Sequence, residues 1–179
     1  MCHPNNEITT FSIKKIIRHE HFDINTYYAD IMLLHLSMKI RFNYSVRPIC
    51  LPNLGISGVS EIYSNRKGVV AGWGSTNAFS LLYSCIPNKL ALPIFAQKDC
   101  NATASTLFCA GFVGGGRDTC KGDSGSPFQI RNLYKRYELI GIVSSGIGCA
   151  LPGNPGQYTD VSLFVPWIIK HLSKYSYCW

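Results

Sequence analysis

The sequence predicts an all-β protein that ends in one helix. Three observations support this: short segments rich in β-branched and aromatic residues recur, glycine and proline cluster between them, and one C-terminal segment has helical spacing. Short strands separated by turn residues are typical of β-barrels and β-sandwiches. With 179 residues, 46% of them hydrophobic, the chain is long enough to bury a substantial core.

Seven segments carry the strand pattern. In chain order they are FSIKKIIRH (11–19), DIMLLHL (30–36), GVVAGWG (68–74), KLALPIF (89–95), LFCAGF (107–112), SPFQI (126–130) and YELIGIVSS (137–145). The clusters GFVGGG and LPGNPGQ supply sharp turns between strands. The expected helix is VPWIIKHLSK (165–174), in which Pro166 suits the first turn and Val165, Ile168, Ile169 and Leu172 form an apolar face.

Charge and hydropathy argue against nucleic-acid and membrane partners. The net charge is +7, but the 17 basic residues are scattered, with pairs such as Lys14-Lys15 and Arg66-Lys67 as the longest runs. Scattered charge is typical of a solvated surface, so we expect no nucleic-acid ligand. No apolar run approaches the roughly 20 residues that a membrane-spanning helix needs.

The eight cysteines indicate an oxidising compartment. None has the spacing of a zinc site, so disulfides are expected and a metal is not. Sequons at Asn43 and Asn101 agree with an extracellular location. The opening MCHPNNEITTF lacks the charged and apolar regions of a signal peptide, so the predicted secretion has no export signal in this sequence.

The stretch RDTCKGDSGSP, residues 117–127, points to nucleophilic chemistry at Ser124. A serine hydroxyl attacks well only when a base takes its proton and donors hold the resulting oxyanion. The glycines of GDSG let the amides of Gly122 and Ser124 point at one place. Taken alone, however, GDSG is more often a turn than a nucleophile.

Further motifs in fixed order place this stretch in context. ADIMLLHL, RPICLP, VVAGWG, FCAGF, RDTCKGDSGSP, GIVSSGIGCA, NPGQYTDV and VPWI together resemble the trypsin/chymotrypsin family of serine endopeptidases. The resemblance implies a double β-barrel with an incomplete N-terminal barrel and a C-terminal helix. The implied parts are the remainder of the N-terminal barrel (1–55), the C-terminal barrel (56–162), and the helix and tail (163–179).

The resemblance implies a role for each matching residue. Ser124 is the expected nucleophile, Asp30 the carboxylate that orients a histidine, and Gly122 with Ser124 the oxyanion hole. Asp118 falls at the base of the specificity pocket, which implies cleavage of proteins or peptides after Arg or Lys; the alternative is an exposed loop acid. Gly146 and Gly156 would leave the pocket open, Tyr158 would line it, and Ser144 would support Asp30.

The resemblance also implies a pairing of the cysteines. Expected bridges join Cys100 to Cys109, Cys120 to Cys149, and Cys2 to Cys85, the last as in some arthropod clip-domain proteases. Cys50 matches the cysteine that ties many relatives to an upstream light chain or regulatory module, and Cys178 has no assigned partner. One family bridge is missing, because Gly68 and Ile130 stand at its two ends.

The family's general base is missing from the sequence. It lies in an AAHC-type motif well before the aspartate, and none of the 29 residues before Asp30 forms that motif. None of the five histidines fits the position; they are His3, His19, His21, His35 and His171. The activation N-terminus that pairs with Asp123 in relatives is also missing, so we expect Asp123 to lack its partner and the pocket to be zymogen-like.

Two readings therefore stay open. The chain is either part of a secreted trypsin-like endopeptidase, inactive without the histidine segment, or a non-catalytic homologue that acts as a binding or regulatory module. Intact residues at positions 124, 30 and 118 favour the first. Neither reading implies a cofactor. Two departures from the family affect substrate contacts: Ser126 replaces a glycine, and Ser145 replaces an aromatic residue that walls the substrate channel.

Overall fold

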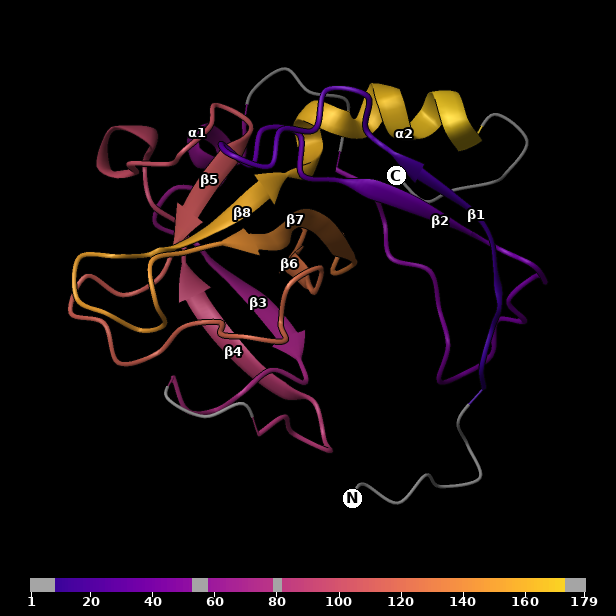
Figure 1. Ribbon diagram of the computed structural model, residues 1–179, viewed down its shortest axis with the longest axis horizontal. Coiled ribbons are helices and arrows are strands. Elements are labelled where there is room, and N and C mark those ends of the chain that lie inside the picture. Colours follow the sequence, from indigo (N-terminus) through magenta and orange to yellow (C-terminus); the bar gives the residue numbers. More distant parts are fainter. Residues whose placement is uncertain (1–8, 53–57, 79–81, 173–179) are drawn as a thin grey trace.

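The computed structural model describes residues 9–52, 58–78 and 82–172. Within these ranges the chain forms two antiparallel sheets and a C-terminal helix (Figure 1). The all-β architecture with one terminal helix therefore agrees with the sequence prediction. None of the helices in the described ranges has the length and apolar character needed to cross a membrane.

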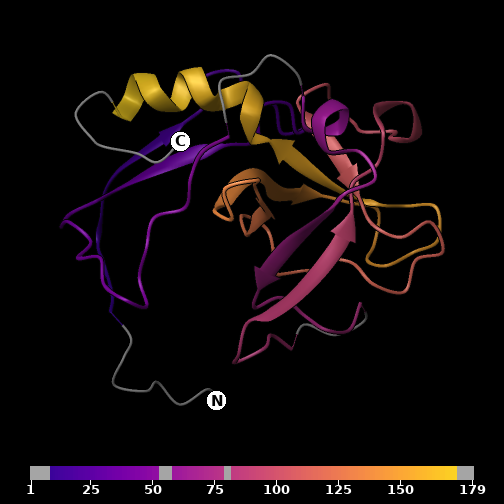
Figure 2. The same cartoon turned by 180° about the vertical axis from the view of Figure 1, so that it is seen from behind.

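The first sheet has two strands, β1 (Ile13–Arg18) and β2 (Met32–Leu36). They pair antiparallel, with an irregularity between Ile13 and Lys15. In Figures 1 and 2 this sheet forms an open, curved arm set apart from the second sheet. It corresponds to the incomplete N-terminal barrel that the sequence predicted.

The second sheet has six strands and closes on itself. Its strands are β3 (Lys67–Gly72), β4 (Asn88–Pro93), β5 (Leu107–Ala110), β6 (Pro127–Arg131), β7 (Tyr137–Ser145) and β8 (Gly156–Asp160). Their order is β4-β3-β6-β7-β8-β5. A backbone β-bridge between Ile94, directly after β4, and Ala110 of β5 joins the two edge strands. The sheet therefore curls into a barrel.

The helices are short. They are α1 (Val59–Tyr63), the 3₁₀ turns η1 (Gln97–Asp99) and η2 (Val161–Phe164), and α2 (Val165–Leu172). The buried side chains of η2 and α2 pack with Ala29 and Ile31 from the segment before β2. Helix α2 therefore joins the C-terminal end of the chain to the first sheet, as Figure 1 shows.

The barrel core is built around three aromatic side chains. Phe108, Phe128 and Tyr158 have ring centroids 4.7 to 5.4 Å apart and are at most 1% exposed. A Cβ placed on buried Gly68 would lie 1.9 Å from Cε1 of Phe128. The phenylalanine ring thus fills the space at Gly68, one of the two positions where the family's bridge is missing.

All seven predicted strand segments contain a strand. The sequence analysis missed β8, α1 and the two 3₁₀ turns. GQYTD and VSEIY are short and lack a clear alternation of apolar and polar residues. The predicted C-terminal helix is present through Leu172, and residues 173 and 174 lie outside the described residues.

Candidate functional site

Ser124 lies in an exposed turn that ends where β6 begins. Two main-chain hydrogen bonds anchor this turn to β7: the Gly125 amide donates to the Val143 carbonyl at 2.9 Å, and the Val143 amide donates to the Ser126 carbonyl at 3.0 Å. Gly125 has φ +82, which glycine adopts without strain. The turn is therefore held in a tight, solvent-facing conformation.

Asp30 is held by Ser144, the residue of β7 that follows Val143. Its carboxylate accepts a hydrogen bond from the Ser144 hydroxyl at 2.7 Å, and its carbonyl accepts one from Thr159 Oγ1 at 2.8 Å. The preceding amide, that of Ala29, donates to Thr106 Oγ1 at 3.0 Å. Because Val143 anchors the serine turn and Ser144 holds Asp30, β7 brings the two predicted triad residues to one region.

The amides of Gly122 and Ser124 are available to a ligand. Neither donates a hydrogen bond to any atom within residues 9–52, 58–78 and 82–172. Gly122 has φ +92, and a Cβ there would lie 2.5 Å from the Tyr83 ring, so no other residue fits without a shift. Two free amides on one turn can hold a developing negative charge.

A cavity of about 400 Å³ is lined by both Ser124 and Asp118. Ser144, Gly146 and Gly156, all predicted as site residues, also line it. A Cβ on Gly156 would lie 2.9 Å from Asp118 Oδ1, so any other residue there would crowd the carboxylate. The cavity therefore has room for a side chain beside Asp118.

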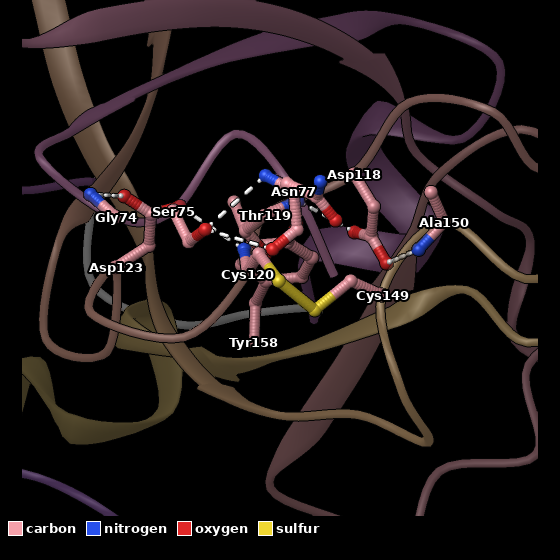
Figure 3. The surroundings of a disulfide bond; sticks show 10 residues. All are labelled: Gly74, Ser75, Asn77, Asp118, Thr119, Cys120, Asp123, Cys149, Ala150 and Tyr158. Carbon is pink, nitrogen blue, oxygen red and sulfur yellow. Dashed lines mark hydrogen bonds between the residues drawn. A yellow bond between two sulfur atoms is a disulfide. The ribbon is translucent and has the colours of Figure 1, made fainter. Parts of the chain in front are cut away.

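Asp118 is partly buried. Its carboxylate accepts hydrogen bonds from the amides of Thr119 at 2.8 Å and Ala150 at 3.1 Å (Figure 3). Burial raises the pKa of this carboxyl above its ordinary value, although these hydrogen bonds oppose the shift. Asp118 therefore borders the cavity and is partly desolvated, a setting in which a cation can pair with its carboxylate.

Tyr158 lies behind the pocket wall. It is fully buried, and its hydroxyl is 3.2 Å from Thr119 Oγ1. Burial raises the pKa of the Tyr158 phenol, so the side chain is neutral at physiological pH. Tyr158 thus supports the residue next to Asp118 from the core side.

Asp123 is partly buried and has neutral donors in place of a cation. Its Oδ1 accepts from the Gly74 amide at 2.8 Å, and its Oδ2 accepts from the Cys120 amide at 3.0 Å (Figure 3). We expected Asp123 to lack its ammonium partner, and main-chain amides donate to its carboxylate instead. Gly74 allows this approach, since a Cβ there would lie 2.4 Å from Asp123 Cγ.

No histidine in the described part of the chain hydrogen-bonds to Asp30 or Ser124. His19 stacks against Trp167, with centroids 4.9 Å apart, and His171 packs on the same indole ring. His21 lies beside His19, and His35 belongs to β2. His3 lies outside the described residues. The same ranges contain no cluster of His, Cys, Asp and Glu that fits a metal ion.

The structure contains the bridges Cys100–Cys109 and Cys120–Cys149. The second joins the segment after Asp118 to the segment before Ala150, and so connects both sides of the pocket. Cys85 and Cys50 are also disulfide-bonded. Cys2, the predicted partner of Cys85, and Cys178 lie outside the described residues.

Comparison with known proteins decides the family. A sequence model of the family described as trypsin matches residues 2–168. The chain belongs to the trypsin family. Its members include serine proteases, so the chain is a serine-protease domain by family, and the two disulfides and the barrel agree with this assignment.

Several trypsin-family proteins are similar along most of this chain. The proclotting enzyme of Tachypleus tridentatus is 40% identical over 170 residues, covering 90% of this chain and 44% of that protein. The clotting factor G beta subunit of the same species is 33% identical, covering 92% and 57%. Trypsin-1 of Astacus astacus is 38% identical, covering 89% and 66%. This chain thus spans about half the length of these curated relatives.

Sequence reasoning missed several residues that shape this trypsin-family site. Tyr27 and Leu151 line the cavity, and Thr106 and Thr159 fix the backbone around Asp30. Tyr27 has φ 58, an unusual value for a side-chain-bearing residue. Its place three residues before Asp30 was a usable signal, whereas nothing in the sequence marked the two threonines.

Proposed function

We propose that this chain is the nucleophile-bearing and substrate-binding part of a secreted trypsin-like endopeptidase that cleaves proteins after Arg or Lys. The observation that carries the proposal is the cavity lined by Ser124 and by the desolvated carboxylate of Asp118. A buried carboxylate without a cationic partner favours a charged guanidinium or ammonium group over an apolar side chain. N-glycans at exposed Asn43 and Asn101 belong to the same proposal.

The proposed reaction is acyl transfer in two steps. Ser124 Oγ attacks the carbonyl carbon after the Arg or Lys residue, and its proton passes to a histidine held by Asp30. The amides of Gly122 and Ser124 stabilise the oxyanion. The amine leaves with the proton, an acyl-enzyme remains on Ser124, and water releases it by the reverse sequence.

The histidine of this reaction must come from outside the described residues. Asp30 is already positioned for it, because Ser144 and Thr159 fix the carboxylate and the carbonyl. Without the base, the chain keeps at most the contribution of the oxyanion hole and substrate binding, about 10³ to 10⁴ over the reaction in water. We therefore propose that this chain alone has little or no peptidase activity.

A second candidate is a non-catalytic homologue that binds a protein through the same pocket. It is supported by the described histidines, none of which hydrogen-bonds to the Asp30 carboxylate. Retention of Ser124, Asp30 and Asp118 favours the endopeptidase, because a binding role does not need a nucleophile. The names of the two Tachypleus relatives favour a regulatory cascade over digestion as the setting.

Extending the transcript upstream of the Met1 codon tests the proposal. An in-frame segment with an AAHC-type motif supports it, and the extended protein is then activated and assayed with peptide nitroanilides ending in Arg, Lys or Phe. We expect hydrolysis after Arg and Lys, a loss of more than about 10⁴-fold in kcat in Ser124→Ala, and a smaller but specific loss for Arg and Lys substrates in Asp118→Asn.

An in-frame stop codon directly upstream overturns the endopeptidase proposal and leaves the binding module. Hydrolysis that prefers Phe over Arg overturns the proposed specificity. Asp99→Asn is the matched control for Asp118→Asn, because it removes the same charge from an exposed turn outside the cavity.

A further inference from the structure

The fold gathers basic side chains that are scattered in the sequence. Arg66 and Lys67 lie at the start of β3, and Arg131, Lys135 and Arg136 lie in the turn between β6 and β7. All five are exposed. We call these five residues the basic corner. Because β3 and β6 are neighbours in the sheet, the ends of the two strands lie side by side.

Hydrogen bonds connect the members of the basic corner. Arg66 Nη2 donates to the carbonyl of Arg131 at 3.3 Å, and Arg131 Nε donates to the carbonyl of Lys135 at 3.1 Å. Both acceptors are neutral main-chain oxygens, so they hold the guanidinium groups in place without cancelling their charge. Each guanidinium keeps further N–H donors for a ligand.

The carboxylate nearest in sequence, that of Glu138, hydrogen-bonds to neutral donors. Glu138 is buried, and it accepts hydrogen bonds from the Asn132 side chain at 2.6 Å and the Tyr63 hydroxyl at 3.2 Å. In the described part of the chain, Arg66, Lys67, Arg131 and Lys135 form no ion pair with a carboxylate. Like charges this close repel one another, and an anionic ligand relieves that repulsion.

Aromatic rings and a tight turn preorganise the corner. Arg66 lies over the Tyr63 ring at 5.3 Å, and Arg136 lies over the Tyr134 ring at 5.6 Å. The Asn132 side chain accepts a hydrogen bond from the Arg136 amide at 3.0 Å, which fixes the turn. The cationic groups therefore lose little conformational freedom when they bind.

We propose that the basic corner binds a sulfated polysaccharide. Several exposed cations on adjoining strand ends match a linear polyanion better than a single phosphate. Exposed Tyr134 supplies a flat apolar surface against which a sugar ring can pack. The disulfides indicate an oxidising compartment, where sulfated polysaccharides are abundant polyanions.

Such a ligand leaves the candidate active site open. Strand β6 starts at Pro127, three residues after Ser124, and ends at Arg131 in the basic corner. At about 3.3 Å per residue, the strand separates the two by more than 10 Å. Binding at the corner therefore localises the protein on a polysaccharide and does not block the pocket.

Titration with heparin at several salt concentrations tests the proposal. The test variant is the triple Arg66→Gln, Arg131→Gln, Lys135→Gln, and the control is the triple Lys14→Gln, Lys15→Gln, Arg18→Gln in β1, which removes the same charge elsewhere. We expect the test variant to bind at least tenfold more weakly, with a shallower dependence of affinity on salt, and the control to change less than twofold.

Equal losses of heparin affinity in the two triple variants overturn the proposal, because they show that heparin responds to net charge and not to the basic corner. Absence of heparin binding at physiological salt also overturns it. Single-stranded DNA of the same charge is titrated in parallel, and tighter binding of DNA through the same residues assigns the corner to nucleic acid instead. Circular dichroism checks the fold of both variants. The readout requires no catalysis, so it stands apart from the proposed peptidase function.

Discussion

At the residue scale, Gly68 shows how a missing bridge is replaced by packing. The family bridge would join positions 68 and 130, and here Phe128 occupies the space beside Gly68 while Ile130 is buried. The loss of both cysteines together is therefore consistent with a core that has been repacked around Phe128.

Gly68→Ala tests this packing. The added methyl group would lie 1.9 Å from Phe128 Cε1, and the fully buried ring has no free space to enter. We expect a loss of about 2 kcal/mol or more in the free energy of unfolding, measured by urea denaturation. Gly114→Ala is the control, because a Cβ there meets nothing within 4 Å, and we expect it to change stability by less than about 0.5 kcal/mol. A stable Gly68→Ala variant would show that the ring moves freely.

Residue identities were predictable where motifs are contiguous and not where contacts are distant. RDTCKGDSGSP marked Ser124 and Asp118 because their spacing is local. The neutral donors around Asp123 come from Gly74 and Cys120. No local motif indicates that Gly74, 49 residues away in the sequence, approaches this carboxylate.

At the element scale, an aromatic and histidine cluster joins α2 to the loop before β2. His19 packs on Phe164 and Trp167, with centroids 5.1 and 4.9 Å away, and Trp167 Nε1 donates to Glu20 Oε2 at 2.9 Å. Burial lowers the pKa of the His19 imidazole; His21 and His171 act in the same direction, and Glu20 opposes them. Protonation of His19 therefore opposes the docking of α2.

The stability of the protein should depend on this histidine. A lowered pKa in the folded state means that stability is fully present above the unfolded value near 6.5 and is lost as pH falls through the folded value. We expect the melting temperature to fall only slightly between pH 7.5 and pH 5.5, because solvent screens this partly exposed imidazole, and to fall less in His19→Phe. The same fall in His19→Phe would contradict this assignment.

Elements with strong patterns were predictable, and short buried ones were not. All seven strand segments and α2 carry apolar periodicity, whereas β8 has five buried residues, GQYTD, with glycine and three polar residues among them. Tertiary hydrogen bonds, such as that from Thr159 to Asp30, stabilise β8, and such partners are invisible in a single sequence. The basic corner was missed likewise, because it forms only when β3 and β6 pair.

At the scale of the whole molecule, the open first sheet leaves an apolar face exposed. Ile16 pairs with Leu34, and these two side chains are 56% and 50% exposed, with Met32 on the same face. Ile17 and Leu33 point the other way and pack against the cluster that includes α2. One face of the sheet thus stabilises the fold, and the other contributes apolar surface.

Substitutions on the two faces should behave differently. The pair Ile16→Thr and Leu34→Thr should reduce the fluorescence of an apolar-surface dye such as ANS, with stability changed by less than about 1 kcal/mol, because little buried area is lost. Leu33→Ala, on the packed face, should lower the free energy of unfolding by about 2 kcal/mol or more. Unchanged dye fluorescence in the double variant would show that the face is covered in solution.

The central claim is that the cavity beside Ser124 selects a cation through Asp118. Calorimetric titration of this chain with the arylamidinium benzamidine tests it directly. We predict one binding site, at least tenfold weaker in Asp118→Asn and unchanged in Asp99→Asn, with affinity that falls as pH drops because burial raises the pKa of Asp118 and a proton then competes with the ligand. Failure of this chain to bind, or equal binding by Asp118→Asn, would contradict the account.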